Sequence, residues 1–350
     1  MAGRNRAAVL YGPRDIRIEH RDTPVPGDGE VLVRSTDVCV CATEVKYWYH
    51  GMPDVLPGTR VVQGHELGGI VEDVGENVKG NIIGSKVAID PSLWCGVCDM
   101  CRAGMANLCR KLQFMSLPPV DGGFQQFYKV SEKNVHPVPE EMPSEWIPLV
   151  EPLSIGINAV SSAERISSSL SGKTVVIVGA GSQGLLLMQA LTVRRGPRKI
   201  CVLEPLDYRR KLAEDLGADM VLDPLDNINE MTDGAGADVV FEGAGESEAY
   251  QLAATSVKPG GTVVIVGIPV EQRHIPIQAV TARRAGLTLT FVRRFNPLDF
   301  PKAIDMIASG KVKVDRLITH FFSLDEITRA FELLHAYSDG VVKAIIRPQL

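Results

Sequence analysis

The sequence contains no long hydrophobic run, no strong excess of charge of either sign and no repeated or low-complexity tract. No uninterrupted apolar segment approaches the roughly 20 residues of a membrane-spanning helix. No apolar signal-peptide core follows the polar, basic start at Met1–Arg6. The net charge of -5 argues against broad nucleic-acid binding, which favours a basic surface. We therefore expect a cytoplasmic protein that binds neither membranes nor nucleic acid.

The residues that are present are typical of a two-domain globular protein. A chain of 350 residues predicts two domains, at about 100–200 residues each. Hydrophobic residues make up 45% and charged residues 23%, a balance that can bury a sizeable core. Glycine, with 33 residues, is above average and suits close approach of the backbone to ligands. The seven cysteines are expected to be metal ligands or free thiols, because a reducing compartment disfavours a disulfide framework.

The first 150 residues and the last 50 have different patterns. Near the N-terminus, short apolar runs at Val31–Val33, Gly68–Val71 and Val87–Ile89 are separated by glycine, aspartate and asparagine, which indicates β-strands. The tail from about Asn296 predicts helices Leu298–Ser309 and Leu324–His335 and a closing strand Lys343–Ile346. Such a tail could pack back on the first domain.

Between these parts, strands alternate with helices. The apolar runs predict strands at Thr174–Val178, Lys199–Leu203, Asp238–Phe241 and Thr262–Val266, and helices at Gln183–Thr192 and Asp207–Leu216. Alternation of this kind indicates a parallel, doubly wound sheet, and hence an α/β fold for this domain.

A glycine-rich motif joins the first of these strands to its helix. Gly179-Ala180-Gly181-Ser182-Gln183-Gly184 is a GxGxxG sequence, in which the glycines allow a tight turn, close approach of a pyrophosphate and close helix packing. Glu204 ends the next strand, where a carboxylate can bind ribose hydroxyls and repel a 2′-phosphate, which favours NAD. The alternatives are a purely structural turn and, because Arg209 and Arg210 lie nearby, some use of NADP.

Four cysteines lie within 15 residues. Cys95, Cys98, Cys101 and Cys109 form C-x2-C-x2-C-x7-C, which can surround one tetrahedral zinc ion without an open position. An iron–sulfur cluster fits less well, because its usual spacing ends in C-x3-C-P, whereas Arg110 follows the last cysteine here. A nucleic-acid-binding zinc ribbon needs two pairs separated by a longer stretch. The spacing predicts a structural zinc site.

A second group of possible zinc ligands is more widely spaced. Cys41, the Gly64-His65-Glu66 segment and Glu151-Pro152-Leu153-Ser154 supply a thiol, an imidazole and carboxylates. Three such ligands and a water leave a zinc site open to substrate. From composition alone, a buried thiol, a surface histidine and two surface carboxylates are an equally good interpretation.

Taken together, these motifs resemble the zinc-containing medium-chain dehydrogenase/reductases, and especially their sorbitol (polyol) dehydrogenase branch. The resemblance covers essentially the whole chain. It rests on Cys41-Ala42-Thr43-Glu44, Gly64-His65-Glu66, the four-cysteine segment, Asp121-Gly122-Gly123-Phe124, Glu151-Pro152-Leu153-Ser154 and the GxGxxG motif. It implies a mainly β GroES-like catalytic domain made of residues 1–153 and 296–350, a Rossmann NAD-binding domain of residues 154–295, and a homodimer or homotetramer.

The resemblance also implies roles in catalysis. Cys41, His65 and Glu66 would bind catalytic zinc, with Glu151 ligating the metal or holding its water, and the four-cysteine segment would bind a second zinc ion. Thr43 would relay the proton of the substrate hydroxyl.

Three positions beside the zinc cysteine depart from the family pattern. Ala42 replaces a usual glycine, Glu44 replaces an aspartate that often orients the zinc-bound histidine, and Lys46 replaces a histidine of the proton path. Lys46 is expected to be solvated or structural, with anion binding as the alternative.

Substrate and cofactor contacts follow from the same resemblance. Tyr47, Phe114 and Leu117 correspond to substrate positions, and Val266, Gly267 and Gln183 to cofactor positions, together with Arg209. Arg293-Arg294-Phe295-Asn296 corresponds to a segment that contacts both, with Arg293 assigned to the cofactor and Arg294, in place of a tyrosine, to the substrate. With Lys46, these arginines could bind a phosphate or carboxylate.

The sequence thus predicts a zinc-dependent, NAD-linked dehydrogenase that oxidises a secondary hydroxyl of a polyol or sugar-like alcohol. A phosphorylated polyol, a sugar acid or an amino alcohol, as in threonine dehydrogenase, are alternative substrates. A non-enzymatic protein that binds NAD and zinc is a further alternative, because the fold does not dictate the function.

Overall fold

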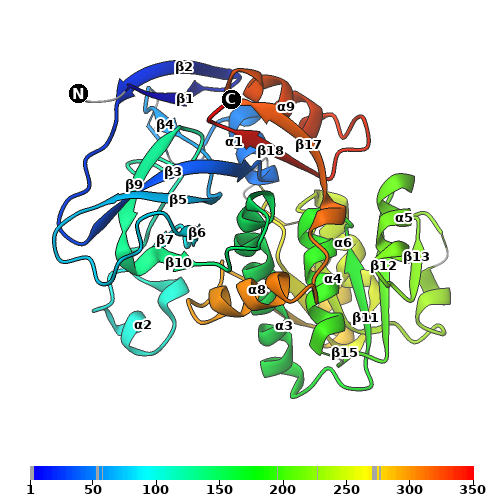
Figure 1. Cartoon of the computed structure of the whole chain (residues 1–350). Helices are drawn as coiled ribbons and strands as arrows, with labels where there is room; N and C mark the ends of the chain where they lie inside the picture. The colour runs from blue at the N-terminus through cyan, green and yellow to red at the C-terminus, as the bar shows by residue number, and fades with distance from the viewer. Residues whose placement is uncertain are drawn as a thin grey trace. The chain divides into compact units, whose positions relative to one another are not determined.

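The computed structural model describes residues 4–52, 55–56, 58–194, 196–226, 228–269, 274–275 and 277–350. These residues form two compact units, which are shown in Figure 1. Unit 1 comprises the chain up to Glu151 together with Asn296–Gly310 and Leu317–Leu350, and unit 2 comprises Pro152–Phe295 and Lys311–Arg316.

Unit 1 is built mainly from strands of both chain ends. Its largest sheet has the order β10-β6-β5-β3-β18-β17, with β9 also pairing with β3. The smaller sheets are β2-β1-β4 and β7-β8. The bounds are β1 Arg4–Gly12, β2 Asp15–Asp22, β3 Glu30–Cys39, β4 Val61–Val62, β5 Glu66–Val74, β6 Lys86–Ile89, β7 Ser92–Leu93, β8 Gln113–Phe114, β9 Phe127–Ser131, β10 Val135–Pro137, β17 Ile318–Ser323 and β18 Lys343–Arg347.

The C-terminal strand joins the sheet of the first domain, as the sequence pattern suggested. Strand β18 pairs antiparallel with β3, with Ile345 opposite Cys39 and Ile346 opposite Val38. Both strands are rich in buried β-branched residues, which suit a sheet that is covered on its faces. Residues from the two ends of the chain therefore share one core, which agrees with a GroES-like domain.

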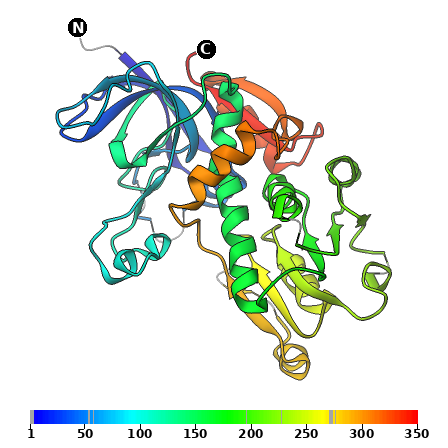
Figure 2. The same ribbon diagram turned by 60° about the horizontal axis from the view of Figure 1, so that its bottom comes forward.

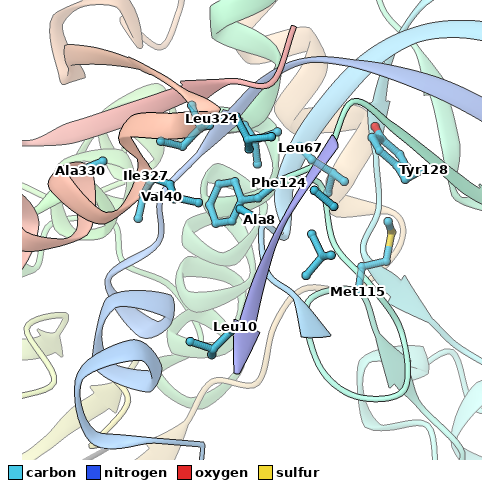
Figure 3. Packing of buried hydrophobic residues seen from close by; sticks show 14 of the residues in the cluster. Ala8, Leu10, Val40, Leu67, Met115, Phe124, Tyr128, Leu324, Ile327 and Ala330 are labelled. Carbon is cyan, nitrogen blue, oxygen red and sulfur yellow. The ribbon is translucent and has the colours of Figure 1, made fainter. Parts of the chain in front are cut away.

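Four short α-helices complete unit 1: α1 Ala42–His50, α2 Asp99–Arg102, α8 Asp299–Ala308 and α9 Ile327–His335. The ring of Phe331 on α9 packs edge-on against Trp48 of α1, with a centroid distance of 5.8 Å, and lies 5.9 Å from Phe124. Figure 3 shows Phe124 among Leu324, Ile327 and other side chains of this core. Burial of these aromatic rings fixes the position of α1, the helix that follows Cys41.

Unit 2 contains a six-stranded parallel sheet with the order β13-β12-β11-β14-β15-β16. The central strand β11, Thr174–Val178, is buried along its whole length, as expected for a strand covered on both faces. The other strands are β12 Lys199–Leu203, β13 Met220–Leu222, β14 Ala237–Glu242, β15 Val257–Ile265 and β16 Thr288–Phe291, and the helices are α3 Val150–Ser167, α4 Ser182–Arg194, α5 Asp207–Asp215, α6 Ser247–Ser256 and α7 Ala279–Ala285. The order reverses between β11 and β14, and ligands of such sheets bind at the carboxyl ends of the strands at this point.

The structure differs from the expected elements in detail. Strand β15 begins five residues before the predicted start, because a bulge lets Val257 pair with Ala237 before the regular register begins at Thr262. The predicted helix Leu324–His335 begins as a 3-10 turn, Leu324–Glu326, closed by the Glu326 side chain on the backbone N–H of Ser323.

Residues 311–316 belong to the second unit, whereas the predicted boundaries place them in the first. Val312 and Val314 are buried, and the backbone N–H of Lys313 donates to Gln189 Oε1 of α4 at 2.7 Å. These contacts were not visible in the sequence, because they join segments more than 100 residues apart. Among the described residues, no helix is both long and apolar enough to span a membrane.

Candidate functional site

Cys41, His65 and Glu66 come together in unit 1. Cys41 directly precedes α1, His65 lies just before β5, and Glu66 is the first residue of that strand. One potential ligand atom from each of the three lies within 4.8 Å of the others. His65 and Glu66 are buried and Cys41 is half-buried. The pairing of Cys39 with Glu66 across β3 and β5 explains this proximity, because it aligns the ends of the two strands.

A single carboxylate orients this cluster. Glu44 is fully buried, and its Oε1 accepts hydrogen bonds from His65 Nδ1 at 2.8 Å, from the backbone N–H groups of Gly64 and His65, and from Ser116 Oγ at 2.9 Å. Its Oε2 accepts from the backbone N–H of Cys41 at 3.1 Å. The glutamate therefore holds the histidine ring and the backbone at two of the three potential ligands. A ring held at Nδ1 offers Nε2 to a metal ion.

Glu66 has a buried partner of its own. The Nζ of Lys343, on β18, lies 3.0 and 2.8 Å from its two carboxylate oxygens, and both side chains are 2% exposed. Burial alone would lower the pKa of Lys343, but the carboxylate of Glu66 and the nearby cysteines raise it, so the lysine carries a charge. Lys343 thus balances one negative charge of the cluster.

Glu151 lies within electrostatic reach of the same residues. Burial, with a further contribution from Glu66, raises its pKa to about 8, while the positive charges of His65 and Lys343 lower it. Among the described residues, its Oε2 is buried without a hydrogen-bond partner. Its carboxyl atoms do not join the group of three potential ligands, so a direct bond from Glu151 to a metal stays a prediction.

The charges at the cluster favour a cation. Burial would lower the pKa of His65, but Glu44 and Cys41 raise it well above its ordinary value. Burial would raise the pKa of Glu44, yet His65 and several hydrogen bonds lower it, so this carboxylate is ionised. A thiol, an imidazole and a carboxylate are the donors that zinc prefers. Cys41, His65 and Glu66 fit a zinc ion whose fourth position is open to water or substrate.

The structure relates only some of the residues expected to contact substrate to the cluster of Cys41, His65 and Glu66. Thr43, Lys46 and Tyr47 lie on α1 and are half-buried. The ring of Phe114 lies 5.3 Å from that of His65, so this residue borders the cluster. Leu117 lies in the turn that follows Phe114 and donates its N–H to the Phe114 carbonyl. Ala42 begins α1 and is exposed.

The four-cysteine segment folds into a separate lobe of unit 1, drawn in cyan in Figures 1 and 2. Potential ligand atoms of Cys95, Cys98, Cys101 and Cys109 all lie within 4.8 Å of one another. Hydrogen bonds from the backbone N–H groups of Cys101 and Arg110 lower the pKa of Cys98 to about 6. The backbone N–H groups of Cys95 and Lys111 point at the sulfur of Cys109, at 3.3 and 3.4 Å. Four sulfurs held in this way fit a closed zinc site.

The glycine-rich loop of unit 2 has the geometry that its motif predicts. Gly179 has a φ of +99°, which favours glycine, and a Cβ at Gly184 would lie 1.9 Å from the Gly179 carbonyl oxygen. At Gly181 an added Cβ would meet only Nη1 of Arg209, at 3.7 Å. The loop lies between β11 and the start of α4, where a helix N-terminus can receive phosphate. Gln183 donates from Nε2 to the carbonyl of Pro152.

The other expected cofactor residues also lie in unit 2. Glu204 is buried at the end of β12. Val266 and Gly267 follow β15 and donate their N–H groups to the carbonyl of Glu242. Arg293 is exposed, and the carbonyl of Arg294, a residue with a φ of 52°, accepts from Asn158 Nδ2 at 2.8 Å.

Sequence reasoning missed two residues that the structure connects to these sites, Ser116 and Lys343. Ser116 and Lys343 are far in sequence from the residues that they contact, at 72 positions from Glu44 and 277 from Glu66. The only available signal for Lys343 was a lysine within the otherwise apolar run Val341–Ile346. Arg210 was noticed, but as an alternative phosphate ligand; its contacts are described below.

Comparison with known proteins agrees with this geometry. The family described as Alcohol dehydrogenase GroES-like domain matches residues 27–140, and the family described as Zinc-binding dehydrogenase matches residues 184–309. A GroES-like unit with a Cys–His–Glu cluster and a Rossmann unit with a glycine-rich loop are typical of zinc-dependent dehydrogenases. The chain belongs to the zinc-containing medium-chain dehydrogenase/reductase family and is a dehydrogenase.

Its relatives place it in the sorbitol dehydrogenase-like branch of that family. Sorbitol dehydrogenase of Bacillus subtilis is 32% identical over 350 residues, which cover 98% of this chain and 97% of the relative. An Escherichia coli oxidoreductase/dehydrogenase of unknown specificity has a solved structure with a TM-score of 0.89, 29% identity and 99% coverage of both chains. A zinc-binding dehydrogenase of Sinorhizobium meliloti, solved with NADP, has a TM-score of 0.86 and 29% identity, covering 99% of this chain and all of that chain.

The raised pKa values predict how pH affects the metal-free protein. Glu151, with a folded pKa of about 8, and His65, also raised, bind more protons in the folded than in the unfolded state. The stabilisation that these two groups contribute is therefore complete below their unfolded pKa values and is lost as pH rises through their folded pKa values. After a chelator has removed the zinc, we expect the free energy of unfolding to fall by about 1 kcal/mol per pH unit for each of the two groups, between its unfolded and its folded pKa.

Denaturant unfolding of the chelated protein between pH 5 and 8 measures this effect. Glu151→Gln should make the free energy of unfolding less dependent on pH, and His65 should still contribute the dependence that remains. A slope that is unchanged in Glu151→Gln would contradict the assignment, because the lowered pKa of Cys98 contributes equally in both proteins.

Proposed function

We propose that the protein oxidises a secondary hydroxyl of a polyol or sugar-like alcohol and transfers the hydride to NAD. The observation that carries this proposal is the cluster of half-buried Cys41 with buried His65 and Glu66, in which Glu44 orients the histidine. The similarity to sorbitol dehydrogenases supports a polyol as the substrate class. The dinucleotide loop and the carboxylate of Glu204 support NAD as the hydride acceptor.

Zinc held by these three residues would supply Lewis acidity, which eases loss of the hydroxyl proton near neutral pH. The remaining roles belong to side chains of the protein. Glu44 and Ser116 keep the imidazole of His65 in one orientation, and Phe114 borders it with an apolar ring. The hydroxyl of Thr43, two residues after Cys41, would accept the substrate proton and release its own proton to solvent. A bound nicotinamide would supply the acceptor for the hydride, and the protein would orient both partners.

Glu204 supports NAD rather than NADP, because a buried carboxylate would repel a 2′-phosphate. The two cysteine-containing clusters support two zinc ions per chain, one catalytic and one structural. No disulfide joins any of the seven cysteines, all of which the structure describes, and thiolate zinc ligands are favoured in a reducing compartment. We therefore place the protein in the cytoplasm, and from its family we propose a homodimer or homotetramer.

The substrate is tested with a panel of neutral polyols, cyclitols, sugar acids, sugar phosphates and amino alcohols, followed by NADH absorbance. We expect the neutral polyols to have the highest kcat/KM. If the kcat/KM of a phosphate ester or sugar acid exceeds that of its neutral counterpart about tenfold, the preferred substrate is an anion and the substrate proposal is wrong. A preference for amino alcohols would also contradict it. Absence of activity on every alcohol, with less than one zinc ion beyond the four-cysteine site, would favour a non-enzymatic protein.

Thr43→Val tests the proton relay. Valine has nearly the same shape but no hydroxyl, so we expect kcat to fall by about 100-fold or more, the range of general acid–base contributions. Zinc content and NADH affinity should stay unchanged, and Thr43→Ser should restore most of the activity. Near-native turnover in Thr43→Val would refute the relay.

A further inference from the structure

Arg210 folds back over the turn that carries Glu204. This residue lies in the first part of α5, yet its Nη1 donates to the backbone carbonyls of Glu204 at 2.7 Å and Pro205 at 2.8 Å. These carbonyls belong to the turn between β12 and α5. The guanidinium fork therefore closes the turn from outside, as a multidentate donor can and a lysine cannot.

Two carboxylates hold the guanidinium in this position. Nη1 of Arg210 also lies 2.9 Å from Oδ2 of Asp223, and Nη2 is bonded to Oδ1 of Asp207. Asp207 is 91% exposed, so solvent weakens its contribution, whereas Asp223 is 29% exposed. Asp223 directly follows β13. The arginine thus joins the carboxyl ends of two neighbouring parallel strands, β12 and β13.

The turn that Arg210 closes sets the position of the Glu204 carboxylate. Oε2 of Glu204 accepts the N–H of Ala180, in the glycine-rich loop, at 2.6 Å. Its Oε1 accepts the N–H of Leu206 at 3.1 Å. Each oxygen keeps a free lone pair for a ribose hydroxyl. A shift of the turn would move both the carboxylate and its contact with the loop.

The same contacts decide what Arg210 can offer to a ligand. In Rossmann domains an arginine near this turn accommodates the 2′-phosphate of NADP. Here the two hydrogens of Nη1 are shared among three acceptors, and Nη2 points at Asp207. Arg210 is neutralised and directed at the backbone, so its charge is not offered to a phosphate.

We propose that Arg210, held by Asp223, is a positioning residue that determines cofactor selectivity: it fixes Glu204 for the ribose of NAD and is itself withheld from the 2′-phosphate of NADP. This inference rests on the proposed use of a nicotinamide dinucleotide. It assigns selectivity to a network outside the cofactor contacts, namely Arg210, Asp223 and the turn 204–206.

Direct binding of NADH and NADPH to the full-length protein, followed by nicotinamide fluorescence, tests the proposal without any alcohol. For Arg210→Met we expect the NADH dissociation constant to rise about tenfold, the equivalent of one hydrogen bond to a charged group. The NADPH constant should change less than about twofold, because its phosphate cannot use Glu204. Selectivity for NADH should therefore fall, which a merely structural loss would not produce.

Arg316→Met is the matched control. Arg316 pairs with Asp215 at the other end of α5, at 2.9 Å, and both side chains are exposed. We expect neither dissociation constant to change in this variant. In addition, the KM for NAD should rise in Arg210→Met while kcat stays unchanged.

Asp223→Asn provides a second, milder variant should Arg210→Met fail to fold. It should also lower the selectivity, and adding it to Arg210→Met should cause no further change, because both act through one network. Equal weakening of both cofactors, or an unchanged ratio in both variants, overturns the inference. Failure of the unmodified protein to bind NADH would instead overturn the proposed function.

Discussion

The buried pair of Glu44 and His65 is the interaction on which the rest of the site depends. One carboxylate, shielded from solvent, accepts hydrogen bonds from the imidazole, from two backbone N–H groups at residues 64–65, from Ser116 and from the N–H of Cys41. Removing one partner of a buried pair typically costs about 3–5 kcal/mol, because the other charge is left unsatisfied. The longer glutamate reaches the histidine in place of the family's aspartate, so this departure preserves the orienting role.

The remaining charges are arranged around this pair by the fold. Lys343 reaches Glu66 only because the last strand, β18, pairs with β3. The chain must therefore complete unit 1 with its C-terminal residues before the cluster is charge-balanced. In unit 2 an analogous constraint acts at the turn 204–206, where Arg210 and Asp223 set the position of Glu204. In unit 1 a charged residue binds the carboxylate that is expected to touch the ligand, and in unit 2 a charged residue binds the backbone of the turn that carries it.

Local motifs were predictable from the sequence, and contacts between distant segments were not. The GxGxxG loop and the four cysteines each lie within one short segment, so spacing alone specifies their geometry. The group of Cys41, His65 and Glu66 needed the order of the family motifs as well, because the residues lie on separate segments. Lys343, Ser116 and the closing contacts of Arg210 escaped prediction, since each depends on a strand register or turn that the sequence pattern does not encode. The role of Glu44 could be suspected, but only the structure shows that its side chain spans the distance.

Glu44 contacts both His65 and the backbone of Cys41, so the metal site proposed at Cys41, His65 and Glu66 should depend on it. The most direct measurement is zinc content per chain in Glu44→Ala, with Glu44→Asp as the control, on protein purified with zinc present. We expect Glu44→Ala to keep the zinc of the four-cysteine lobe and to lose the other ion, whereas Glu44→Asp should keep both. Two zinc ions per chain in Glu44→Ala, bound as tightly as in the unmodified protein, would contradict it.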